Sequence, residues 1–257
     1  MERALADAPE LPDTQLALGI VSLQEGRFSA AISALERAVA MAPTHTLALE
    51  QLGRLEIEAG RAARGMDRLA YVAELDPMRR QCLVPIARAH ALRGKMGAFD
   101  DAIARLHGGD REHLREEVHI QMRVACWTRD TERARAALCH ISVLPPTHAP
   151  RFRALGELLL GTATGTAFQD ATDELLAQPI CPRLRAVVRQ LGAEAFAERD
   201  LRYAMKMLEG LASEPLIDIE WIELCPALEP MRGLAAFDRL RDVVRERVAG
   251  MWAASEQ

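Results

Sequence analysis

Residue types recur along this chain at intervals of 34 residues, and this period restricts the possible folds more than any other feature of the sequence. Three pairs of residues show the interval: Gly19 and Gly53, Gly26 and Gly60, and Pro43 and Pro77. Each interval has the pattern of two short amphipathic helices that join at a glycine and end at a proline. One such pair cannot bury its apolar side alone, so pairs of this kind stack on their neighbours. The sequence therefore predicts an all-helical solenoid.

The composition agrees with stacked helices and excludes several classes of function. Hydrophobic residues make up 49% of the chain but aromatic residues only 4%, which favours a core of Leu, Ala, Val and Ile. The formal net charge of −5 gives no general attraction for polyanions, so we expect neither a nucleic-acid partner nor a membrane partner. No apolar run reaches membrane-spanning length, and the five cysteines are scattered without a C-x-x-C pair. We expect a cytoplasmic protein with reduced thiols and no cofactor.

The period divides the chain into a repeat array, residues 1–215, and a C-terminal cap, residues 216–257. The expected units of the array span about residues 12–45, 46–79, 80–109, 110–148, 149–181 and 182–215. Pro85 lies near the start of the third unit and predicts a first helix that begins late or bends. The third unit is expected to end early, at Gly108-Gly109. The fourth unit lacks the glycines, and Arg129-Asp130-Thr131 is its expected turn and helix cap.

The first unit carries the signature residues of a known repeat at the positions of Leu18, Gly19, Gly26, Phe28, Ala31, Ile32, Leu35, Ala38 and Pro43. The second unit follows the same pattern except at Gly65, where the pattern has alanine. The chain thus resembles the tetratricopeptide repeat family of 34-residue helix-turn-helix units. This resemblance implies a right-handed superhelical solenoid of about six units with a C-terminal capping helix. It also implies that another protein or peptide binds on the concave surface formed by the first helix of each unit.

The C-terminal region has a different pattern from the units. An amphipathic helix is expected from about Ala235 to Ala254, with charged residues that give the solenoid a polar end. The stretch from Trp221 to Leu240 is similar to the C-terminal end of tetratricopeptide regions in large bacterial signalling proteins. Those regions follow kinase, nucleotide-cyclase or transcription-regulator modules, and no kinase or cyclase motif is present in this sequence.

The concave positions of the first helices give the candidate partner-binding groove: Leu16, Ile20, Leu23, Glu50, Arg54, Arg88 and Arg123. The carboxylate clamp of the family has Lys and Asn at four of these positions, so a clamp of that kind is not expected here. Instead, three arginines share one groove position in consecutive units, and we call them the arginine ladder: Arg54, Arg88 and Arg123.

The ladder is a hypothesis for binding acidic groups. Guanidinium groups on adjacent helices can bind carboxylates or phosphates in a bidentate manner, next to the apolar side chains of the first unit. The alternative is that an arginine-rich chain places three arginines in register by chance. The hypothesis predicts that Arg88→Glu weakens partner binding with little loss of stability.

For three other motifs we expect no metal-binding, phosphate-binding or catalytic role. His113, Glu116, Glu117 and His119 share a helix face but lack the convergent spacing of a metal site, so a solvated face is expected. The glycines and threonines of residues 161–166 are too closely spaced for a phosphate-binding loop. Cys139 and His140 are sequence neighbours and project about 100° apart on a helix, which does not suit a nucleophile and its base.

The leading interpretation is a protein-interaction scaffold that binds an extended peptide or helix in its concave groove, in bacterial signalling or regulation. The alternative is a regulatory sensor region of a larger kinase, cyclase or transcription regulator. An enzyme on a helical-repeat scaffold is the least favoured class, because no catalytic set converges. The sequence leaves the identity of the partner and the oligomeric state open.

Overall fold

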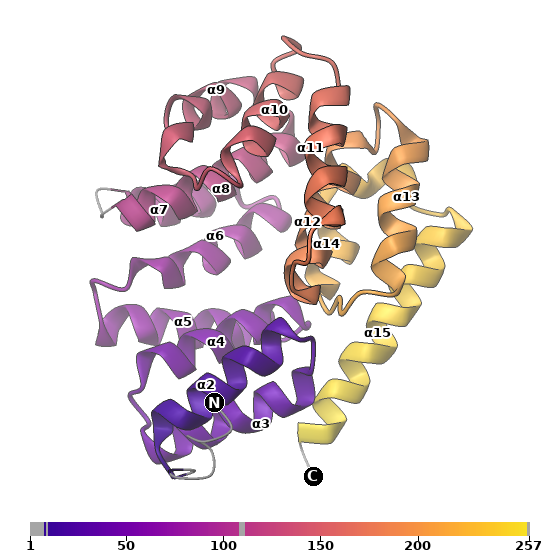
Figure 1. Ribbon diagram of the computed structural model, residues 1–257. Helices are drawn as coiled ribbons and strands as arrows, with labels where there is room; N and C mark the ends of the chain where they lie inside the picture. The colour runs from indigo at the N-terminus through magenta and orange to yellow at the C-terminus, as the bar shows by residue number, and fades with distance from the viewer. Residues whose placement is uncertain (1–7, 9, 108–110, 256–257) are drawn as a thin grey trace.

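The computed structural model describes residues 8, 10–107 and 111–255, and the expected Gly108-Gly109 end of the third unit lies outside them. Within these ranges the chain forms helices, turns and loops and no strand. The helices follow one another as antiparallel pairs stacked in chain order (Figure 1). The predicted all-helical repeat fold is confirmed.

Each of the six residue ranges expected for a unit contains one pair of helices. The pairs are α2 (Pro12–Gln24) and α3 (Phe28–Met41), α4 (Thr46–Glu58) and α5 (Ala62–Leu75), α6 (Leu83–Leu92) and α7 (Met96–Leu106), α8 (Arg111–Thr128) and α9 (Thr131–Cys139), α10 (Ala149–Leu159) and α11 (Thr166–Ala177), and α12 (Pro182–Phe196) and α13 (Leu201–Ala212). The C-terminal region contains α14 (Ile219–Leu224) and α15 (Ala235–Ser255). Short 3-10 helices span Arg80–Cys82, Ile141–Val143 and Pro226–Met231. The third unit therefore does start its first helix late, with Pro85 in the first turn of α6.

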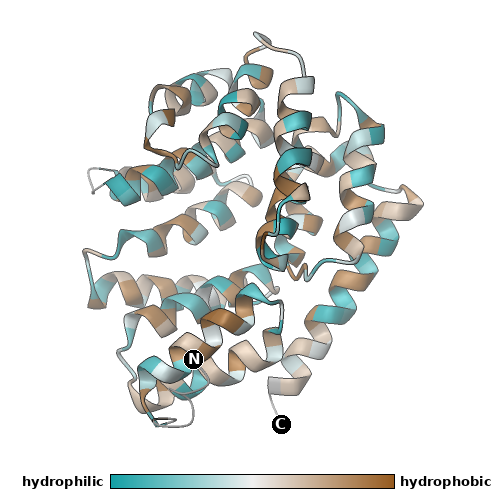
Figure 2. Ribbon diagram, viewed as in Figure 1, coloured by the Kyte–Doolittle hydropathy of each residue, from teal (hydrophilic) through white to brown (hydrophobic). Residues whose placement is uncertain are grey.

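Apolar and polar residues alternate along the helices, as the patches of brown and teal in Figure 2 show. The apolar sides form a core of Leu, Ala, Ile, Val and Met with few rings, as the composition predicts. Within the described residues, no helix is both long enough and apolar enough to cross a membrane.

In five of the six units, the turn between the two helices contains a residue in the left-handed backbone conformation. Glycine supplies it in four units, at Gly26, Gly60, Gly94 and Gly161, with φ between 69° and 79°. In the fourth unit Arg129 takes the same conformation with φ of 56°, and it is the one non-glycine residue with positive φ in the described ranges. Asp130 then caps α9 by accepting a hydrogen bond from the backbone N–H of Arg133, as predicted.

We expect Arg129→Gly to raise the free energy of unfolding by about 1 kcal/mol, because glycine adopts positive φ without the steric cost of a Cβ atom. Denaturant unfolding of both proteins measures the change. Arg129→Ala is the control, since it also removes the exposed ion pair with Glu198 but keeps the Cβ atom. Equal stability of the two variants would contradict this explanation.

Gly65, which departs from the repeat pattern, lies at a close contact between α4 and α5. A Cβ atom at this position would lie 2.5 Å from the carbonyl oxygen of Gly53 and 2.9 Å from the backbone nitrogen of Ile57. Both atoms belong to helix backbone and cannot move without shifting α4 itself. The glycine is therefore a packing requirement of this pair.

Gly65→Ala should lower the free energy of unfolding by about 1–3 kcal/mol, the usual cost of overpacking a tight helix contact. The matched control is Gly97→Ala in the first turn of α7, because no heavy atom lies within 4 Å of a Cβ atom built there. Denaturant titrations of the two variants give the comparison. A Gly65→Ala protein as stable as the control would show that the helices separate without cost.

The superhelix closes on itself, because the C-terminal region returns to the first two units. The yellow helix α15 in Figure 1 runs from α13 to α3, and the indole N–H of Trp252 donates to the carbonyl oxygen of Ala59 at 2.9 Å. Residues 216–218 and α14 enter the concave side, where α14 contacts α4 and α6. The expected cap thus packs on the last unit and also covers the inner face of the first units.

Candidate functional site

The inner face of the first unit is covered by the chain's own C-terminal residues. Leu16 and Leu23 are buried in one apolar cluster with Ile217 and Trp252, and half-buried Ile20 packs against that cluster. These three predicted groove residues are therefore part of the core in this structure. Their role in binding a partner stays a prediction.

Glu50 and Arg54 join the second unit to the third. The Glu50 carboxylate accepts from Arg54 at 2.9 Å and from Arg79 at 3.2 Å, and its side chain is buried. Arg54 also donates to the carbonyl oxygen of Gln81 at 3.3 Å. Since Arg54 is about one-third exposed, it is the most accessible arginine of the ladder.

Arg88, the second arginine of the ladder, binds a carboxylate that lies 130 positions later in the chain. Its two terminal nitrogens donate to Asp218 at 2.6 and 3.3 Å, and both side chains are largely buried. Asp218 also accepts from the Gln190 amide and from the backbone N–H of Trp221, each at 3.1 Å. The pair therefore holds residues 216–218 against the inner face.

Arg123, the third arginine, is paired in the same way. Its Nε and Nη2 atoms donate to the Glu194 carboxylate on α12 at 2.5 to 3.1 Å. The indole N–H of Trp221 donates to the same carboxylate at 2.6 Å. The arginines of the ladder therefore pair with carboxylates of the same chain, and their binding of a partner's acidic groups stays a prediction.

The expectation that Arg88→Glu causes little loss of stability has to be revised, because the substitution would place two carboxylates together inside the protein. For the neutral change Arg88→Met we expect a loss of about 3 kcal/mol, since Asp218 is left charged and buried without a cation. Arg54→Met is the control: Glu50 keeps Arg79 as a partner, so the loss should be about 1 kcal/mol. Urea unfolding compares them, and equal losses would contradict the structural role of the Arg88 pair.

A pocket of about 270 Å³ remains on the inner face between α6, α8, α10 and α12, and we call it the inner pocket. Its polar lining comes from Arg88, His119, Arg123, His148 and Arg151. Its apolar lining includes Val84, Phe152, Leu184 and Val187. It is the place where the inner face combines apolar surface with several guanidinium groups, so it is our candidate site.

The sequence pattern missed three residues of this site. His119, His148 and Arg151 do not share the groove position that relates the arginines of the ladder. The sequence pattern places His119 only on a charged helix face. It lies between two aromatic neighbours, with ring centroids 4.7 Å from Phe152 and 5.7 Å from His148. Only the crossing of α8 and α10 brings these rings together.

Both histidines of the inner pocket are neutral at physiological pH. Burial lowers the pKa of His119 to about 3, and the charges of nearby His148, Arg151 and Arg115 act in the same direction. Burial and the same two arginines also lower the pKa of His148 below its ordinary value of 6.5. The histidines therefore add hydrogen-bonding nitrogens but no charge to the pocket.

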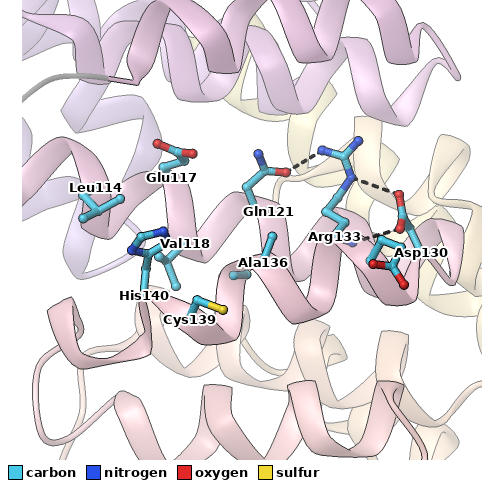
Figure 3. Close-up of a pocket in the computed structure, with 11 residues that line it drawn as sticks. Leu114, Glu117, Val118, Gln121, Asp130, Arg133, Ala136, Cys139 and His140 are labelled. Carbon is cyan, nitrogen blue, oxygen red and sulfur yellow. Dashed lines mark hydrogen bonds and ion pairs between the residues drawn. The ribbon is translucent and has the colours of Figure 1, made fainter.

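A second hollow, of about 550 Å³, lies between α8 and α9 (Figure 3). Three of its polar residues contact one another: Arg133 donates to Gln121 at 2.5 Å and pairs with Asp130 at 3.5 Å. Cys139 and His140 border the hollow, but no hydrogen bond joins the thiol to the imidazole. The structure therefore gives no geometric support for a nucleophile and its base at these two residues.

No group of three or more His, Cys, Asp and Glu side chains converges as a metal site in the part of the chain that the structure describes. The five cysteines are free thiols. Burial raises the pKa of the Cys82 thiol to about 11 and that of Cys126 to about 12, so neither is a reactive thiolate at neutral pH.

The comparison with known families agrees with the helix pairs of the first units. Residues 22–82 match the tetratricopeptide repeat family. The matched range runs from the end of α2 to the 3-10 turn before α6 and covers about a quarter of the chain. The tetratricopeptide repeat is a helical protein-interaction repeat, and it is not an enzyme family. No curated protein is similar enough to this chain to count as a match.

Proposed function

We propose that the protein is an interaction module that holds a segment of another protein at the inner pocket. The observation that supports this proposal is the position of the pocket on the concave face of a tetratricopeptide-like superhelix, beside two arginines of the ladder. Apolar surface next to guanidinium groups suits a partner segment with an apolar anchor and acidic neighbours.

The proposed contact occupies a shorter part of the groove than an extended peptide bound along its whole length would occupy. The C-terminal region covers the inner face of the first two units, where Leu16 and Leu23 are buried. Displacing it would break several ion pairs and expose Ile217 and Trp221, which are at most 1% exposed. We therefore propose that a partner contributes one anchoring side chain or helix end at the third to sixth units.

The wider setting that we propose is a bacterial signalling or regulatory system in the cytoplasm. The similarity of residues 221–240 to the ends of tetratricopeptide regions in signalling proteins supports a role in signalling or regulation. The five free thiols support a cytoplasmic location, because such thiols persist in a reducing compartment.

Filling the inner pocket should remove partner binding without unfolding the protein. We expect Val187→Trp, at the half-buried wall of the pocket, to lower recovery of the partner from a cell lysate at least tenfold, as measured by quantitative mass spectrometry after affinity capture. Leu201→Trp is the control, because Leu201 is exposed at the start of α13 and lies outside the pocket lining. The same proteins recovered by both variants and by the wild type would place the partner on another surface.

A further inference from the structure

Arg151 differs from the other guanidinium groups of the inner pocket because it has no acidic partner among the described residues. It is the third residue of α10 and only 3% exposed. No carboxylate of the described residues lies within ion-pair distance of it, and its Nε and Nη1 atoms are buried without a hydrogen-bond partner. A buried charge without a partner is rare in proteins, because burial removes the hydrating water and no other group takes its place.

The surroundings of Arg151 do not neutralise it. Its guanidinium carbon lies 5.4 Å from the centre of the Phe152 ring, which gives a weak attraction compared with an ion pair. Burial and the nearby charge of Arg123 lower the pKa of Arg151 only to about 10, so the group is still a cation at neutral pH. Its place in the first turn of α10 adds the positive end of a helix dipole. All these features favour an anion next to it.

The charges around the inner pocket indicate that a ligand bound there carries a single negative charge. Arg88 and Arg123 are matched by Asp218 and Glu194, the two histidines are neutral, and nearby Arg115 is paired with Glu112 and Glu116. One unmatched positive charge remains, on Arg151. A monoanion compensates it, whereas a phosphate dianion would bring one negative charge too many into a buried site.

The remaining lining describes the rest of the ligand. Around Arg151 the pocket presents Phe152, Leu184, Val187 and Leu191, which favour a hydrocarbon body. A volume of about 270 Å³ equals the share of roughly nine water molecules in the liquid, enough for about ten non-hydrogen atoms. The Nε2 atom of His119 and the Nδ1 atom of His148 are also buried without a partner, so each can donate to or accept from a polar head group according to its tautomer.

We propose that the inner pocket binds a carboxylate carried by an apolar group of about this size, with Arg151 as the residue that holds the carboxylate. The source is either a free monocarboxylic acid or the C-terminal residue of a peptide, which share this chemistry. The site uses α8, α10 and α12 and involves none of the positions that a carboxylate clamp would occupy in the first two units. It is a property of the isolated protein and does not require the protein partner of the proposed function.

The test is calorimetric titration of the full chain with sodium phenylacetate and sodium octanoate, each compared with its neutral amide. We expect the wild type to bind at least one acid about tenfold or more tightly than the matching amide. Arg151→Gln should remove this preference for the acid while leaving the weak affinity for the amide. The matched control is Arg153→Gln, because Arg153 is exposed on the same helix, and it should bind like the wild type.

Thermal unfolding separates binding from a structural role of Arg151. If Arg151 holds a ligand, Arg151→Gln should keep or raise the Tm of the protein measured without added acid, because a buried unmatched charge is removed. A purely structural role predicts a lower Tm. If the variant is too unstable to titrate, Val187→Trp is the second variant, since it fills the pocket with Arg151 intact and should also abolish acid binding.

A further arm identifies the source of the carboxylate. Acetylated pentapeptides that end in leucine are titrated with a free and with an amidated C-terminus. Binding of the small acids supports a free metabolite-sized acid, and binding of only the free-carboxylate peptide supports a chain terminus. The proposal is overturned if no acid or peptide binds, if acid and amide bind equally, or if Arg151→Gln binds like the wild type. These outcomes are independent of the affinity-capture experiment, which tests the binding of a protein partner alone.

Discussion

The architecture depends on ion pairs that join the last unit and the C-terminal region to the second and third units across the concave side. Arg88 with Asp218, Arg183 with Glu58 and Arg93 with Glu220 each join residues more than 100 positions apart. An open solenoid would leave these positions in water, where such pairs contribute little. In the closed arrangement Arg88 and Asp218 are largely buried, and each charge requires the other because an unmatched buried charge costs several kcal/mol. Apolar contacts of Ile217 and Trp252 with the first unit supply the favourable burial that holds the closure together.

The 34-residue period predicted the parts of the fold that are determined locally. Pro85, Asp130 and the turn glycines act through the backbone of their own unit, so their effects on helix starts, caps and turns follow from sequence position. Gly65 shows the limit of this reasoning: it departs from the pattern, and its reason is the distance to Gly53 and Ile57 across two helices. The closure was not predictable from the period, because Ile217 and Asp218 lie beyond the last repeat and no rule of repeat stacking places them at the first.

The candidate site was predicted in part. Arg88 and Arg123 both line the inner pocket, at groove positions that recur with the period. The period could not show that Asp218 and Glu194 would reach them, since those contacts depend on the path of the chain over 130 and 71 positions. Arg151 gave no sequence signal. It is one of many arginines, and only the absence of an acid near it distinguishes it from the others. The absence of an acidic neighbour can be recognised only when the positions of all surrounding residues are known from the fold.

The closure and the inner pocket are physically coupled. Helix α12 supplies Leu184 and Val187 to the wall of the pocket, and it also carries Gln190 and Glu194, which bind Asp218 and Arg123. A ligand that contacts Arg151 on α10 and the apolar side of α12 therefore binds only when these helices are brought together. By linkage, such a ligand stabilises the arrangement of α10 and α12 that it binds, and this stabilisation grows with the logarithm of the ratio of its concentration to its dissociation constant. In that arrangement Arg88 and Arg123 keep their ion pairs with Asp218 and Glu194. A small acid at Arg151 would thus act on the very surface that a protein partner has to enter, which gives this repeat superhelix a physical route for regulation.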